Sequence, residues 1–270
     1  MIILKLLKRN FFVKLVESLK KCDLISLKGN SAQLILTAKS VNSIFTIFLA
    51  KNEFQISDSF SVCLKPTDLL KAIKTLKTDC FCFSEKLKIF FDVEITKFST
   101  VKEIEFYYQK RHLEENDGEI NVLNYTEGDL NRLFPNFVEI PFIESHLIER
   151  KEISEIDSAV TQFFLNKNCL KHIPVGKISL YAGDLLIIHR LDLAVEERTE
   201  LAVDFIKRSN NEFICYNYWS DILINLINFI DSVLIEIYEN YMVIIVTFDK
   251  EGETRIEIMN EKLFYTLNHL

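Results

Sequence analysis

Four residues have the types and spacing that could support catalysis. Cys169 lies three residues before His172, and a cysteine near a histidine can act as a nucleophile beside its base. Asp92 and Glu94 alternate along an expected strand, as two carboxylates that exchange a proton could do. No third group near Cys169 would orient the histidine. Acidic residues that alternate along a strand are more often solvent-exposed surface residues than a catalytic pair. We therefore expect no catalytic residue, with an enzyme built from distant residues as the remaining alternative.

The sequence also lacks the short motifs that hold metals and phosphates. It contains no G-x-S-x-G, no H-E-x-x-H and no Walker loop, and only 6 of its 270 residues are glycine. Cys80 and Cys82 form a C-x-C pair with no second pair nearby, whereas zinc needs about four converging ligands. We therefore expect no metal and no cofactor, and we interpret the six cysteines as buried, reduced thiols in a reducing compartment.

Lysine is the residue type that indicates another chemistry, the binding of phosphate. Two segments, Asn10–Lys21 and Pro66–Lys77, have apolar residues at helical spacing and lysine on the opposite face. The lysines are Lys14 and Lys21 in the first segment, and Lys71, Lys74 and, at the edge, Lys77 in the second. Lysine on a helix face is often only solvated. Whether these lysines instead form a phosphate-binding surface depends on how charge is distributed along the whole chain.

The charge of the chain is unevenly distributed. The net charge is −7, yet residues 1–125 hold 19 basic against 15 acidic residues, and residues 126–270 hold 13 against 24. A positive surface on an acidic protein indicates one concentrated face for a polyanion. Since lysine contacts to phosphate carry no sequence information, such a face would bind a duplex without reading bases, and salt would weaken the binding.

Short apolar segments predict an antiparallel framework with few helices. In the first half we expect strands at Met1–Leu7, Leu24–Lys28, Gln33–Ala38, Ser43–Leu49, Phe60–Leu64, Cys80–Ser84, Leu87–Val93 and Val101–Tyr108. In the second half we expect helices at Ser154–Asn168 and Ser220–Ile230, and strands at His146–Ile153, Lys177–Ala182, Leu185–Arg190, Thr199–Ile206, Val233–Tyr238, Met242–Phe248 and Arg255–Met259. Two helices at matching positions in each half indicate an internal repeat.

An acidic, polar stretch separates the two halves. Residues 113–157 contain 12 acidic residues and three basic ones, a composition typical of a linker. We predict a domain at 1–112, a connecting linker at 113–144 and a second domain at 145–270. The apolar run from Ile222 to Ile237 is broken by Asp231 and Glu236, so we expect no membrane span.

This order of strands, helices, acidic linker and repeat resembles that of the sliding DNA clamps, the family of proliferating cell nuclear antigen. Local stretches are most similar to the Rad-nine-type subunit of the nine-one-one checkpoint clamp. These stretches are Leu36–Leu49 with Asn52–Phe54, Leu130–Phe134, Thr199–Val203 with Glu212–Tyr216, and Asn228–Ser232 with Thr247–Asp249.

The resemblance implies an α+β fold of two repeated clamp domains, each with two helices on the concave side of antiparallel sheets. Three such subunits would pair edge strand to edge strand in a ring of six domains around double-stranded DNA. The partners implied are two other clamp subunits, an ATP-dependent clamp loader, and repair and checkpoint proteins, in the nucleus and away from membranes.

The resemblance also implies two sets of site residues. The lysines that would face the DNA are Lys14, Lys21, Lys71, Lys74, Lys77, Lys167 and Lys171. The residues that would line an apolar pocket for partner proteins, beneath the linker, are Ser43, Ile44, Phe45, Leu130, Leu133 and Phe134.

One expected helix departs from the family's basic lining, because Ser220–Ile230 contains no lysine or arginine. This favours a heterotrimer, in which only one subunit would contribute such a helix. Two clamp functions stay open: a subunit of the heterotrimeric DNA-damage checkpoint clamp, and a homotrimeric replication clamp that tethers DNA polymerase.

Overall fold

The computed structural model describes most of the chain. The described residues are 2–39, 43–49, 51–76, 80–83, 88–91, 97–115, 136–139, 159–174, 178–190, 197–208, 212–215, 219–238, 241–248 and 252–260. Several predicted features lie outside them: Lys77, Asp92, Glu94, Leu130, Leu133, Phe134 and the expected strand at His146–Ile153.

The first half of the described chain contains nine strands and three α-helices. The strands are β1 (Ile2–Leu6), β2 (Leu24–Gly29), β3 (Leu34–Lys39), β4 (Ser43–Leu49), β5 (Phe54–Ile56), β6 (Phe60–Leu64), β7 (Cys80–Phe83), β8 (Lys88–Phe91) and β9 (Asn136–Glu139). The helices are α1 (Arg9–Ser18), α2 (Pro66–Leu76) and α3 (Val101–Glu115), with a 3-10 helix, η1, at Lys51–Glu53. The apolar spacing therefore predicted α1 and α2 correctly.

The second half of the described chain also contains nine strands, with two α-helices. The strands are β10 (Thr161–Asn166), β11 (Ile178–Ala182), β12 (Leu186–Arg190), β13 (Glu197–Leu201), β14 (Asp204–Lys207), β15 (Glu212–Cys215), β16 (Ser232–Ile237), β17 (Tyr241–Phe248) and β18 (Gly252–Asn260). The helices are α5 (Lys167–Leu170) and α6 (Trp219–Leu226).

The described strands form three antiparallel sheets. Their orders are β5-β1-β7-β8-β9, then β14-β10-β16-β17-β18-β4-β3-β2-β6, then β13-β12-β11-β15. The nine-stranded sheet passes from the second half to the first where β18 pairs with β4. This seam runs from Arg255 opposite Phe48 to Asn260 opposite Ser43.

The two halves are copies of one module. Apart from η1 before β5 and α3 between β8 and β9, each runs in the order strand, helix, five strands, helix, three strands, so that β1 to β9 correspond one by one to β10 to β18. Under this correspondence the five-stranded sheet matches β14-β10-β16-β17-β18, and the four-stranded sheet matches β4-β3-β2-β6. The predicted internal repeat and the α+β fold class are confirmed.

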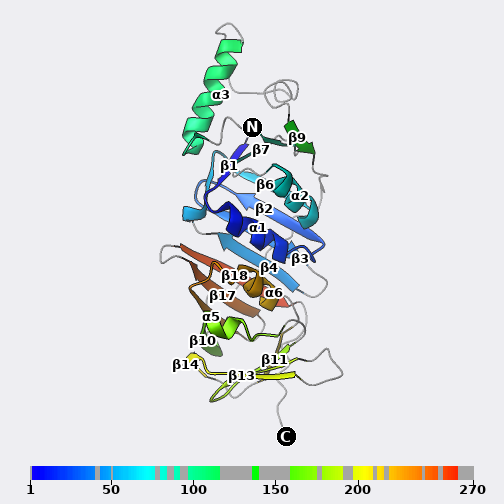
Figure 1. Cartoon of the computed structure of the whole chain (residues 1–270), viewed down its shortest axis with the longest axis vertical. Coiled ribbons are helices and arrows are strands. Elements are labelled where there is room, and N and C mark those ends of the chain that lie inside the picture. The colour runs from blue at the N-terminus through cyan, green and yellow to red at the C-terminus, as the bar shows by residue number, and fades with distance from the viewer. Residues whose placement is uncertain are drawn as a thin grey trace.

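Helices α1, α2, α5 and α6 lie on one face of this array (Figure 1). Helix α1 packs against α2 in its own repeat and against α6 in the other. At the second contact the rings of Phe11 and Phe229 meet edge to face, with centroids 5.9 Å apart. One hydrophobic core continues beneath both repeats and includes Leu15 of α1 and Leu223 of α6. The shared core therefore fixes the helices of the two repeats relative to one another.

The strand expected at Val101–Tyr108 is wrong, because these residues begin helix α3. The Glu103 carboxylate accepts hydrogen bonds from the backbone N–H groups of Ser99 (2.7 Å) and Thr100 (2.9 Å). In return, the Thr100 hydroxyl accepts one from the Glu103 N–H (3.3 Å). This is a capping box, and Thr100-x-x-Glu103 is its sequence signature. The apolar residues Val101, Ile104 and Tyr108 are buried at helical spacing, which alternation along a strand would not allow.

Helix α3 lies on the opposite face of the five-stranded sheet from α1 and α2. Lys5 of β1 and Gln55 of β5 alternate along their strands with residues of the core, so both point to that face. The Lys5 ammonium donates to the Phe98 carbonyl, and Gln55 Oε1 accepts from the Val101 N–H at 3.0 Å. These two contacts hold the start of α3 against β1 and β5.

The helix expected at Ser154–Asn168 is also wrong where the structure describes it. Thr161, Phe163 and Leu165 are buried while the residues between them are more exposed, which is the period of a strand. Neighbouring apolar residues such as Phe163 and Phe164 can share one face of a helix, but here they point to opposite faces of β10. Only α5, four residues long, follows it, and Asn166 Oδ1 caps it by accepting from the N–H groups of Asn168 and Cys169, both at 3.0 Å.

Smaller differences concern short elements. The strand expected at Thr199–Ile206 is two strands, β13 and β14, and the last expected helix ends at Leu226. The strands β5, β9 and β15, of three or four residues, were missed. β9 falls inside the stretch assigned to the linker, and the domain boundaries stay a prediction. No helix in the described part of the chain is long and apolar enough to cross a membrane.

Replacing Thr100 by alanine should destabilise α3 by about 1 kcal/mol, because the Glu103 N–H loses its capping acceptor. Native-state hydrogen exchange of the Ile104 and Tyr108 amides should become faster. Lys102→Ala, an exposed change in the first turn of the same helix, serves as the control. Equal exchange in the two variants would show that the capping box does not hold this helix.

Candidate nucleic-acid interface

Four of the lysines predicted to face DNA lie on α1, on α2 or in the turn after α1. Lys14 is in α1, Lys21 follows it, and Lys71 and Lys74 are in α2. All four side chains are exposed. Because α1 and α2 pack side by side on one face of the sheets, the elements that carry these lysines lie on the same side of the molecule (Figure 1).

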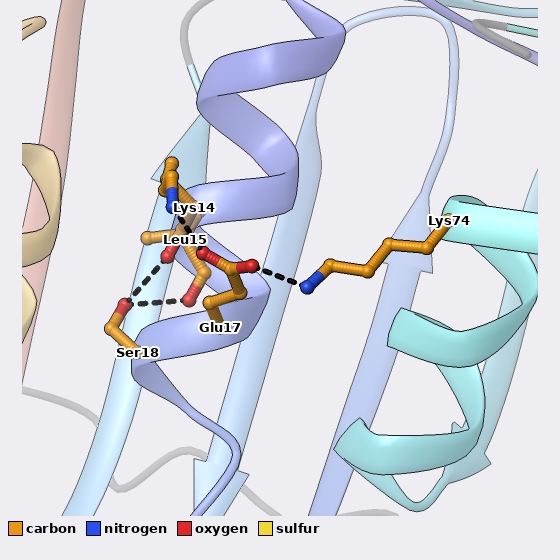
Figure 2. A network of polar contacts seen from close by, with 5 residues as sticks. All are labelled: Lys14, Leu15, Glu17, Ser18 and Lys74. Atoms are coloured by element: carbon orange, nitrogen blue, oxygen red, sulfur yellow. Dashed lines mark hydrogen bonds and ion pairs between the residues drawn. The ribbon is translucent and has the colours of Figure 1, made fainter. Parts of the chain in front are cut away.

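Glu17 connects the two helices through their lysines. Its Oε2 lies 2.7 Å from Lys14 Nζ in the same helix, and its Oε1 lies 2.6 Å from Lys74 Nζ in α2. Figure 2 shows the carboxylate between the two ammonium groups. The lysine side chains remain 48% and 53% exposed, against 20% for the Glu17 side chain. The lysines thus stay accessible from solvent while the acid is partly covered.

The contact between α1 and α2 has further polar support. The Arg9 guanidinium donates to the Ile73 carbonyl at 3.0 Å, in the last turn of α2, where the helix dipole favours a cation. In α1, the Ser18 hydroxyl donates to the Leu15 carbonyl at 2.6 Å (Figure 2). The Arg9 bond joins the two helices and supports the spacing at which Lys74 reaches the Glu17 carboxylate, whereas the Ser18 bond lies within α1.

The two lysines determine the charge state of Glu17. Hydrogen bonds from Lys14 and then Lys74 lower the pKa of the Glu17 carboxyl, and partial burial opposes this only in part. Glu17 is therefore ionised at neutral pH, and the three groups together carry one net positive charge. Lys71, one turn before Lys74, has no ion-pair partner among the residues that the structure describes. The face thus stays positive although an acid lies in its middle.

The second repeat contributes less positive charge to this side. Lys167 is the first residue of α5 and Lys171 follows its last turn, and both are exposed. Helix α6 contains no lysine or arginine, and its exposed side chains include Asn225. The positive charge of the helix-bearing face is therefore concentrated on the first repeat.

Solved structures of sliding clamps share this architecture over nearly the whole chain. A PCNA2–PCNA3 complex from Sulfolobus tokodaii matches with a TM-score of 0.63 at 12% identity, over 97% of this chain and 99% of that one. Proliferating cellular nuclear antigen from Entamoeba histolytica matches with 0.60 at 10% identity, over 97% and 99%. PCNA from Thermococcus kodakaraensis matches with 0.59 at 13% identity, over 97% and 100%.

The chain has the PCNA clamp fold. By sequence alone it matches no family model, and the search of the curated proteins finds no match. The likeness is therefore one of three-dimensional structure.

In this clamp fold the predicted partner pocket is described only in part. Ile44 and Phe45 are both buried in β4, but they point to opposite faces of the sheet. Phe45 belongs to the core beneath the helices, whereas Ile44 lies on the other face, opposite Met259 of β18. Ser43 begins β4, and the linker residues of the pocket lie outside the described residues. The pocket stays a prediction.

The groups considered for catalysis do not form a site where they are described. Cys169 Sγ donates to the Ala202 carbonyl at 3.6 Å, and His172 is exposed in the following turn. Cys22, Cys63 and Cys80 are buried, and burial raises the pKa of the Cys22 thiol to about 12, which keeps it protonated and unreactive. Within the described ranges no group of three or more metal-ligating side chains comes together.

Glu17 is the residue of this lysine-bearing face that was not expected from the sequence. The signal in the sequence was its position three residues after Lys14, on the same helical face. Its second partner, Lys74, is 57 positions away in the sequence, and only the packing of α1 against α2 brings the two together.

Glu17→Gln should lower the free energy of unfolding by about 0.5 kcal/mol at pH 7, since two partly exposed ion pairs are lost. The folded pKa of Glu17 is depressed, so its stabilisation is present above the unfolded pKa of about 4.3 and disappears as the pH falls through the lower folded value. The difference between wild type and variant in urea unfolding should therefore shrink from pH 7 to pH 3.

Glu105→Gln is the matched control, because Glu105 is a half-buried helical glutamate with no ion pair among the described residues. A difference that stays constant with pH in Glu17→Gln would contradict the role assigned to its charge.

Proposed function

We propose that this chain is one subunit of a ring-shaped sliding DNA clamp. The observation that carries the proposal is the composition of the nine-stranded sheet. It consists of one five-stranded part and one four-stranded part, joined at the β18–β4 seam. The same two parts recur as separate sheets that end in β9 and in β13. The strands that correspond to β18 and β4, which pair at the seam, are therefore edge strands of the two other sheets.

A second clamp subunit can complete these sheets by the same geometry. β9 corresponds to β18 and β13 corresponds to β4, so β9 of one subunit can pair with β13 of the next as β18 pairs with β4 within the chain. Such a head-to-tail contact closes into a ring when the rotation per subunit allows it. Closure also covers sheet edges that would otherwise favour aggregation. Following the resemblance to sliding clamps, we take the ring to hold three subunits.

The helix-bearing face would then surround the DNA. Lys14, Lys71 and Lys74 would contact phosphates, with Lys21, Lys167 and Lys171 nearby. Weak, sequence-independent contacts are sufficient in a ring, because release requires the ring to open. The protein would act as a scaffold and not as an enzyme.

We further propose a heterotrimer of the DNA-damage checkpoint, which acts in the nucleus. Support comes from α6, which has no basic residue and would enter a homotrimeric lining three times. The similar structure from Sulfolobus tokodaii is a complex of PCNA2 with PCNA3, a precedent for unlike clamp chains in one assembly. Two other clamp subunits, an ATP-dependent loader, and repair and signalling proteins would be the partners.

The alternative is a homotrimeric replication clamp that tethers DNA polymerase. It is favoured by β9 and β13 being present in the same chain, so that identical copies could form every contact of a ring.

The mass of the purified chain distinguishes the two functions. In sedimentation equilibrium at micromolar concentration, we expect a single 31.6 kDa chain, because its two edges need other subunits. A stable particle of three times that mass would overturn the heterotrimer and support the replication clamp.

The DNA contacts can be tested by changing one charge at a time on the assembled clamp. Lys71→Gln should weaken retention of a labelled duplex at 0.1 M salt by roughly two- to fivefold. It should also reduce, by about one, the slope of the logarithm of the binding constant against the logarithm of the salt concentration. Glu17→Gln should strengthen retention by a similar factor, because Lys14 and Lys74 lose their competing carboxylate.

Lys28→Gln is the control, since it removes the same charge from the sheet face opposite the helices. Equal effects of Lys28→Gln and Lys71→Gln would contradict the placement of DNA along α1 and α2.

A further inference from the structure

At β5 the five-stranded sheet ends in an edge that no other described strand covers. The Leu7 N–H donates to the Glu53 carbonyl at 2.8 Å, and the Ser57 N–H donates to the Ile3 carbonyl at 3.0 Å. Residues 53, 55 and 57 therefore direct their backbone groups toward β1. Since these directions alternate along an antiparallel strand, the N–H and C=O groups of Phe54 and Ile56 point away from β1. In the described part of the chain, β5 pairs with β1 alone.

These groups open into a cleft of about 520 Å³ between β5 and the start of α3. Leu7, Gln55 and Ser31 line the side of the sheet, and Val101, Lys102 and Glu105 line the side of the helix. The bond from the Val101 N–H to Gln55 Oε1 holds the helix at the strand. The volume lies within the range of about 300–1,000 Å³ typical of binding pockets.

The lining of the cleft has a mixed apolar and basic character. The Leu7 side chain is 43% exposed and offers an apolar surface. Lys51 and Lys102 line the cleft from η1 and from α3, and both are exposed without an ion-pair partner among the described residues. Glu105, half-buried, is the acidic group of the lining, so one positive charge remains in excess.

We propose that this cleft binds an extended, acidic peptide segment of a partner protein as an added strand beside β5. The outward backbone groups of Phe54 and Ile56 would supply the main-chain hydrogen bonds, which is the usual source of affinity in strand addition. Lys51 and Lys102 would select carboxylate side chains, and Leu7 would contact an apolar one. The proposal goes beyond the clamp function and does not depend on DNA binding or ring formation.

The cleft is a property of the first repeat. Its far wall is α3, which lies between β8 and β9, whereas the corresponding strands β17 and β18 are separated by residues 249–251 alone. Among the described residues, β14, the counterpart of β5 in the second repeat, therefore has no helix that corresponds to α3 beside it. A partner that binds here would distinguish the two ends of the subunit.

Strand addition can be tested on the full chain with a fluorescein-labelled octapeptide that alternates valine with aspartate. Fluorescence anisotropy should report binding, and the same peptide with lysine in place of aspartate should bind roughly tenfold more weakly. Replacing both lysines, Lys51→Glu with Lys102→Glu, should reverse this preference. No anisotropy change up to millimolar protein, or a preference unaffected by the double replacement, would overturn the proposal.

Two further measurements test the geometry of the complex. Ser31→Trp should fill the cleft and abolish binding, whereas Ala32→Trp, at the neighbouring exposed position outside the lining, should not. Bound peptide should slow hydrogen exchange of the Phe54 and Ile56 amides. Binding without that protection would show that the peptide does not add to β5. Circular dichroism of each variant verifies its folding.

Discussion

The arrangement of this protein depends on the pairing of β18 with β4. Because successive side chains of a strand point to opposite faces, a slip of one residue would turn every side chain of one repeat to the wrong face. The observed register places Phe45 opposite Ile258, both in the core, and Phe48 opposite Arg255 on the other surface. It is this register that puts the helices of both repeats on a common face.

A second contact across the seam is polar and buried. The Thr254 hydroxyl of β18 donates to Glu53 Oε2 of η1 at 3.0 Å, with both residues almost inaccessible to solvent. A buried carboxylate is costly unless hydrogen bonds compensate for its lost hydration. The bond therefore favours the one alignment of the repeats in which Thr254 reaches Glu53, and it adds directional specificity to the apolar packing beneath the seam.

The electrostatics of the helix-bearing face follow from this shared geometry. Packing α1 against α2 concentrates lysine, and like charges at close distance repel one another. Glu17 relieves this repulsion by accepting Lys14 and Lys74 on its two oxygens. The Glu17 carboxylate also neutralises one of the two lysine charges, so the net positive charge of the face is lower by one. The gain is that both ammonium groups are held in position, so in the proposed clamp they would lose less side-chain entropy on contacting a phosphate.

The sequence could predict what local spacing encodes. Apolar periodicity located α1 and α2, and the order of elements led to the repeat and to the clamp fold. The failures also have physical causes. Phe163 and Phe164 fit a helical face as well as a strand, and only the pairing of β10 with β14 and β16 decides between them. The ion pair of Glu17 with Lys74 depends on tertiary packing, which no local pattern contains.

Helix α3 illustrates a different kind of failure, because its signal was present but was outweighed. Residues 101–108 are rich in β-branched and aromatic side chains, which favour a strand. The capping box and the spacing of Val101, Ile104 and Tyr108 favour a helix, and the helix is realised because it covers the face of β1 that bears Lys5. On the corresponding non-core face of β10 in the second repeat, the Phe164 side chain is 40% exposed. One module thus exists in two versions. The buried lysine of the first is tolerated because the Phe98 carbonyl, in the segment just before α3, accepts the hydrogen bond that water would otherwise accept.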